Sequence, residues 1–151
     1  DVYESNQAVC DLCIDYLDKV NAQLEGTPFK VAYRTRNEVL LYVVNNLPYT
    51  KEEDGTERSQ EYVIARALDE ITNMKILSRI EGDESKVTAD FLGKLKNTIS
   101  EALTAVSSLR YADKAKSGDE EGVEDIEKSI SLAKLTEMTK KLDSGYTSFW
   151  S

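Results

Sequence analysis

Apolar residues recur every three or four positions over most of the chain, and this spacing predicts amphipathic α-helices. The first predicted helix covers about residues 4–24 and stops before Gly26-Thr27-Pro28, since glycine and proline mark helix ends. Residues 29–33 are predicted to form a short extended approach to the next helix. The apolar face of the first helix consists of Cys10, Cys13, Leu17, Val20 and Leu24.

A second helix is predicted to begin near Thr35 and to stop at Pro48. Thr35 and Glu38 have the spacing of a capping box, in which the threonine hydroxyl accepts from the Glu38 N–H and the Glu38 side chain reaches back. Residues 50–58, TKEEDGTER, are polar throughout and predict a solvated loop. The apolar stripe of the helix consists of Val39, Leu40, Val43, Val44 and Leu47.

The third predicted helix, about residues 59–81, carries apolar residues around more than one face, which is typical of a central helix. Gly82 follows it and is expected to be the helix stop, because glycine is favoured just past a helix end. The fourth helix is predicted over about residues 87–112, where apolar residues again repeat every three or four positions.

Residues 113–128 include SGDEEGVEDIEK, which is acidic and poor in apolar side chains, so a mobile loop is predicted there. A fifth helix is predicted over about residues 132–144, with Ser131 as its N-cap and Gly145 as its stop. The aromatic tail YTSFW is expected to dock on the bundle. These elements predict one all-α domain over residues 1–151, a bundle of about five helices with at most a minor extended element.

The charge argues against several functions. The chain carries 28 acidic and 19 basic residues, a formal charge of −9, which disfavours binding to nucleic acid or to an anionic membrane. No apolar run approaches the roughly 20 residues that a membrane span needs. The sequence begins at Asp1 with no initiator Met and no signal-like segment, so we expect a processed chain or a piece excised from a longer protein.

Few side chains offer catalytic or metal-binding chemistry. The sequence has no histidine, the most common general base and metal ligand. Cys10 and Cys13 lie on the apolar face of a predicted helix, and a structural zinc site needs about four ligands, so we expect two partly buried core thiols. Reduced thiols suit the cytosol. Phosphate-loop, GxSxG and HExxH motifs are absent, and we expect no catalytic residue, no metal site and a cytoplasmic location.

Three segments follow one another in the order of a known family. Residues 29–39, FKVAYRTRNEV, are similar to F-x-F-G-Y-R-V-x-N-E-I, and residues 68–82, LDEITNMKILSRIEG, to D-x-x-I-x-x-K-I-L-P-K-I-x-G. Residues 131–149, SLAKLTEMTKKLDSGYTSF, are similar to S-x-x-K-L-x-x-M-x-x-x-L-x-x-x-G-F-T-S-F. Together they resemble the C-terminal helical lid of McrB-like AAA+ proteins, the nucleotide-hydrolysing subunits of restriction systems directed at modified cytosine. Ala32, Ser78 and Glu81 depart from the family's usual glycine, proline and histidine.

The resemblance implies a lid from the C-terminus of a larger AAA+ ATPase or GTPase. Such a lid closes over the nucleotide and contacts its own core domain and neighbouring subunits of an oligomeric ring, but it is not catalytic alone. ATP or GTP with Mg²⁺ would belong to the parent, and the fragment would hold no cofactor. Arg34 matches the motif arginine and is the nucleotide-sensing candidate, with Arg36 as the second. Motif positions with expected structural roles are Tyr33, Asn37, Glu38, Lys75, Arg79, Gly82, Gly145 and Phe149.

Other interpretations stay open. Arg34 or Arg36 could pair with Glu38 or with another carboxylate of this acidic chain. The chain could also be a stand-alone helical module for protein–protein interaction. A DNA-binding helical domain is disfavoured by the charge.

Overall fold

The computed structural model describes residues 1–107, 110–112 and 126–150, and most of these residues are helical. This confirms the prediction of an all-α bundle of about five helices. Two 3₁₀ turns, η1 (Leu77–Arg79) and η3 (Leu142–Ser144), follow the fourth and last helices. The α-helices of the described residues are α1 (Val2–Ser5), α2 (Gln7–Leu24), α3 (Tyr33–Asn46), α4 (Gln60–Lys75), α5 (Ala89–Val106) and α6 (Ile130–Lys141).

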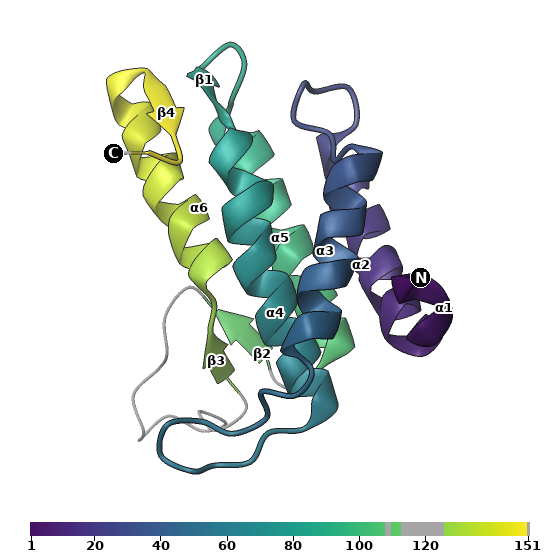
Figure 1. Cartoon of the computed structure of the whole chain (residues 1–151). Helices are drawn as coiled ribbons and strands as arrows, with labels where there is room; N and C mark the ends of the chain where they lie inside the picture. The colour runs from purple at the N-terminus through teal and green to yellow at the C-terminus, as the bar shows by residue number, and fades with distance from the viewer. Residues whose placement is uncertain (108–109, 113–125, 151) are drawn as a thin grey trace.

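The long helices form two layers, with α3, α4 and α6 side by side and α2 and α5 behind them in the view of Figure 1. The central helix is α4, which packs against α3, α5 and α6. Its buried residues point in several directions, as predicted for a central helix, and include Val63, Ile64, Ala67, Leu68 and Ile71.

Two small strand pairs lie at opposite ends of the bundle (Figure 1). At one end, β1 (Glu81–Asp83) pairs antiparallel with β4 (Tyr146–Ser148), so the tail docks through its backbone. The expected docking is only partial, because the Tyr146 and Trp150 side chains stay 50% and 64% exposed. At the other end, β2 (Arg110–Ala112) pairs in parallel with β3 (Ile126–Lys128). The fourth predicted helix therefore ends earlier than expected, because α5 stops at Val106. The predicted acidic loop is wrong for residues 126–128, and residues 113–125 lie outside the described residues.

Three other helix boundaries differ from the sequence prediction. The first helix is two helices, because Asn6 leaves the helical conformation with φ −141°. The third ends at Lys75, where the Ser78 hydroxyl donates to the carbonyl of Met74, and Gly82 lies farther on, within β1. The last begins at Ile130 with Ser129 as N-cap, whose hydroxyl accepts from the Leu132 N–H, so the assignment of that role to Ser131 was wrong.

The predicted capping box at Thr35 was wrong as well. Helix α3 begins at Tyr33 after the extended residue Ala32, with no side-chain cap, and Thr35 lies inside its first turn. Glu38 turns instead toward α4, where its carboxylate lies 3.3 Å from Lys75 Nζ. By contrast, Gly145 ends the last helical segment in a left-handed conformation, φ +93°, as the sequence predicted.

Candidate functional site

The start of α3 carries the two arginines singled out by the sequence. Phe29 is buried, and Val31 is held by Asn21 of α2, whose Oδ1 accepts from the Val31 N–H at 2.7 Å. Ala32 follows as the extended residue from which α3 begins. The chain therefore presents the first turn of α3 to solvent in a defined orientation.

Arg34 is exposed on this first turn, and within the described residues it forms no ion pair or hydrogen bond. Neighbouring Tyr33 is 75% exposed. The alternative that an arginine pairs with Glu38 is not realised, because Glu38 is paired with Lys75. A positive charge without a partner thus lies next to backbone N–H groups that no side chain caps.

Arg36 lies in a different environment, a pocket of about 400 Å³ between the N-terminal helices and α3. We call it the α1–α2–α3 pocket. Arg34 is not part of its lining, so the two arginines face different surroundings. From α1, its N-cap and α2 the lining residues are Asp1, Val2, Tyr3 and Ile14. From α3 they are Tyr33, Arg36, Asn37 and Leu40.

The motif residues outside α3 lie in α4, in η1, and in or next to the β1–β4 pair. Arg79 is exposed in η1, and Gly82 lies in β1, where an added Cβ would come within 3.0 Å of Lys86 Cβ. Phe149 packs against the hydrophobic core, with Lys134 Nζ 4.5 Å from its ring centroid. Apart from Lys75, the partner of Glu38, the motif residues outside α3 thus gather around the β1–β4 pair.

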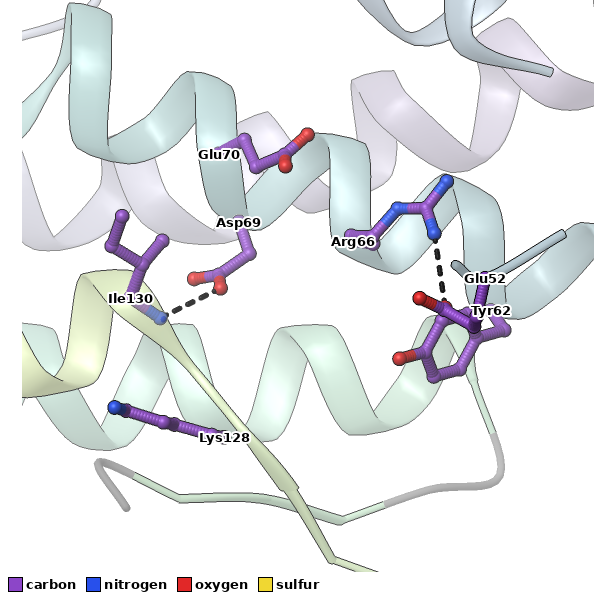
Figure 2. A pocket seen from close by; sticks show the side chains of 7 residues that line it. All are labelled: Glu52, Tyr62, Arg66, Asp69, Glu70, Lys128 and Ile130. Atoms are coloured by element: carbon purple, nitrogen blue, oxygen red, sulfur yellow. Dashed lines mark hydrogen bonds and ion pairs between the residues drawn. The ribbon is translucent and has the colours of Figure 1, made fainter. Parts of the chain in front are cut away.

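A second pocket, of about 270 Å³, lies between α4, the loop after α3 and the start of α6 (Figure 2). Arg66 holds the loop, donating to Glu52 Oε1 at 3.2 Å and to the Tyr49 carbonyl at 2.7 Å. Asp69 faces the start of α6 and accepts from the Ile130 N–H at 2.9 Å. Glu52, Asp69 and Arg66 are thus already engaged in contacts between elements of the bundle. We therefore interpret this pocket as a structural feature. The sequence analysis did not single out Asp69; a carboxylate among the apolar positions of a central helix was the available signal.

In a chain without histidine, carboxylates and the two cysteines are the side chains that could ligate a metal ion. The described residues contain no group of three or more His, Cys, Asp or Glu residues that could hold a metal ion. Cys10 and Cys13 are free and buried, as core thiols are. Burial raises the pKa of the Cys13 thiol to about 12, and burial together with Asp11 raises that of Cys10, so both thiols are protonated at neutral pH. No helix in the described part of the chain is long and apolar enough to cross a membrane.

Fold and surface together define a helical-bundle domain that presents an unpaired arginine at a helix start and a pocket beside it. The chain belongs to the family described as Domain of unknown function (DUF8727), whose model matches residues 1–146. The comparison with curated proteins gave no match, and the comparison with solved structures gave none either.

Proposed function

We propose that this domain is the helical lid of an AAA+ ATPase or GTPase related to the modified-cytosine restriction subunits, with Arg34 as its nucleotide-sensing residue. The observation that supports the proposal most directly is the position of Arg34. It is exposed on the first turn of α3 and has no partner among the described residues. The ordered resemblance of three segments to the McrB-like lid gives that arginine a role.

The physical chemistry of this position suits a phosphate group. A guanidinium is always charged and donates two parallel hydrogen bonds to phosphate oxygens. The first turn of a helix adds free N–H groups and the positive end of the helix dipole. In a chain of charge −9, an arginine that remains unpaired can approach an anion without first breaking an ion pair. Arg36 lines the α1–α2–α3 pocket, so the proposal assigns the phosphate contact to Arg34.

In this role the domain would not hydrolyse nucleotide by itself. The parent would supply the phosphate loop, the acid that holds Mg²⁺ and the ATP or GTP. Its core domain and the neighbouring subunits of a cytoplasmic ring would be the partners of the lid. A contact between Arg34 and the nucleotide would stabilise the closed lid over the open one, so nucleotide state would shift the lid between two angles.

The first experiment is to determine the coding sequence upstream of Asp1. A Walker A loop and a Walker B acid there would give Arg34 a nucleotide, and a stop codon just upstream would contradict the proposal. In the full protein, Arg34→Ala is expected to lower kcat/KM for hydrolysis by roughly tenfold to a hundredfold, since a hydrogen bond to a charged group is worth about 1.5–3 kcal/mol.

Two variants sharpen the assay. Arg34→Lys keeps the charge but lacks the planar guanidinium that donates two parallel hydrogen bonds, so it is expected to restore only part of the activity. Lys51→Ala is the control, since Lys51 is exposed in the loop at the opposite end of α3 and has no side-chain partner in the described residues. Equal hydrolysis by Arg34→Ala and Lys51→Ala, or rapid hydrolysis by the isolated domain, would refute the proposal.

The second candidate is a stand-alone helical interaction module. It is favoured by an apolar groove of about 340 Å³ between α3 and α4, lined by Leu41, Tyr42, Asn45 and Ile71 among others. Leu41 is 52% exposed at its edge. The same coding sequence decides between the candidates, because a reading frame that starts just before Asp1 favours the module.

A further inference from the structure

We propose that the α1–α2–α3 pocket docks a protein segment in which one large apolar side chain is flanked by lysine or arginine. This goes beyond the proposed function, since the pocket is lined by other residues than Arg34. The inference rests on three features: apolar and aromatic side chains in the lining, an acidic border on the α2 side, and hydrogen-bond donors on the α3 side.

The pocket is open, and its lining combines apolar side chains with polar ones. Val2, Ile14 and Leu40 line it, and the rings of Tyr3 and Tyr33 complete it. A volume of about 400 Å³ lies at the small end of ligand pockets and accommodates one large apolar side chain with part of its backbone. Tyr33 is 75% exposed, so an incoming side chain would cover a ring that now faces water.

The α2 side of the pocket is acidic. Asp11 precedes Ile14 by three residues and Asp18 follows it by four, so both lie next to Ile14 on the helix surface. Asp11 accepts from the hydroxyl of the lining residue Tyr3 at 2.9 Å. Asp18 is exposed and unpaired within the described residues. Asp1 also lines the pocket, and its carboxylate accepts from the Glu4 N–H at the start of α1.

This border determines the chemistry of the occupant. Neither Asp11 nor Asp18 is in an ion pair within the described residues, since Lys19 of the same helix pairs with Asp15 instead, at 3.1 Å. The acidic α2 side therefore attracts lysine or arginine.

The α3 side supplies donors for the backbone of the segment. Arg36 lines the pocket and has no ion pair in the described part of the chain. The Asn37 amide lies beside it in the lining. Both donate hydrogen bonds, so they can engage the backbone carbonyls of a bound segment while its basic side chains face α2.

The test is an NMR titration of the 151-residue chain with two pools of short peptides. In the basic pool, Leu, Phe or Tyr is flanked on both sides by Lys or Arg; in the acidic pool, Asp or Glu takes the flanking positions. We expect saturable shifts of the Ile14, Leu40 and Tyr33 signals with the basic pool only. Equal binding of the acidic pool, shifts confined to another face, or no saturable shift with the basic pool would overturn the proposal.

Matched variants locate the contacts without touching the core. Tyr33→Ala is expected to weaken binding at least about fivefold, the effect of losing an aromatic contact, whereas Tyr49→Ala removes a 64% exposed tyrosine outside the pocket and should leave affinity unchanged. Asp18→Lys is expected to weaken binding about threefold or more, with the loss reduced at high salt.

The charge control is Glu101→Lys, which makes the same charge change at an exposed, unpaired position of α5. If Glu101→Lys weakens binding as much as Asp18→Lys, the attraction is unspecific and the docking site is refuted. Arg34→Ala should bind the basic pool like the parent chain, so this test stands apart from the nucleotide-sensing one.

Discussion

Asp69 and Ser129 lie sixty positions apart in the sequence, yet the Ser129 hydroxyl donates to Asp69 Oδ1 at 2.7 Å in the interior of the bundle. The same carboxylate accepts from the backbone N–H groups of Ile130 at 2.9 Å and Ser131 at 3.1 Å (Figure 2 shows the contact with Ile130). Helix α4 thus caps α6 with a side chain of its own. Free N–H groups at a helix start need such an acceptor when water cannot reach them.

The first prediction concerns this cap. Asp69→Ala should lower the free energy of unfolding by about 2–4 kcal/mol, because a buried hydroxyl and two N–H groups lose their acceptor. Asp69→Asn should remain destabilising, since its amide NH₂ cannot accept from the N–H groups it would face. Urea denaturation followed by circular dichroism measures both. Asp90→Ala, which removes an exposed carboxylate paired with Lys94, is the control and should cost well under about 1 kcal/mol.

A second prediction contrasts two glycines. Gly82 has φ +154°, and an added Cβ would lie 3.0 Å from Lys86 Cβ, so Gly82→Ala should destabilise the domain by about 1–3 kcal/mol. Gly93 lies within α5, where an added Cβ meets nothing within 4 Å, so Gly93→Ala should stabilise it by about 0.5–1 kcal/mol. Thermal melts compare the two, and shifts of the same sign would contradict the account.

A third prediction concerns the buried hydrogen bond between Tyr16 of α2 and Thr72 of α4, whose oxygens lie 2.7 Å apart. Tyr16→Phe and Thr72→Val should each cost about 1–2 kcal/mol, because each leaves a buried hydroxyl without its partner. The double variant should cost less than the sum of the two. Strict additivity in this double-mutant cycle would show that the two hydroxyls do not interact.

A fourth prediction follows from the buried thiol of Cys13. Burial raises its pKa from 9.0 to about 12, so above pH 9 the unfolded chain loses a proton that the folded chain keeps. Stability from this group is therefore complete below pH 9 and is lost as the pH rises toward 12, at up to about 1.4 kcal/mol per pH unit.

Urea unfolding between neutral and alkaline pH measures that slope, and Cys13→Ala is the matching variant. It should unfold with a shallower pH dependence above pH 9, since burial also raises the pKa values of Cys10 and Tyr16 and these groups keep part of the slope. A slope unchanged by Cys13→Ala would rule out the thiol as a cause of the alkaline loss.

Local pattern alone determined the helical class, the central position of α4 and the core face of α2. These follow from apolar spacing, because a helix with one apolar face must bury it whatever its neighbours are. The helix end at Gly145 was also predictable from the local sequence, because a φ of +93° favours glycine whatever the distant contacts are.

Other features depended on residues far apart in the chain. Asp69 of α4 binds the Ser129 cap of α6, and Asn21 of α2 binds the Val31 N–H just before α3 begins. The sequence prediction placed both helix starts too late. Gly82 belongs to a strand because β4 pairs with it.

For the candidate site residues, too, the sequence determined one part and the tertiary structure the other. The sequence singled out Arg34 and Arg36 but did not show that their surroundings differ. The difference arises because α1 and α2 pack beside α3 and form a pocket that Arg36 lines and Arg34 does not. Periodicity reports which face of an element is buried, whereas a pocket, a cap from another helix or a strand pair needs contacts between elements, and only the tertiary structure decides those.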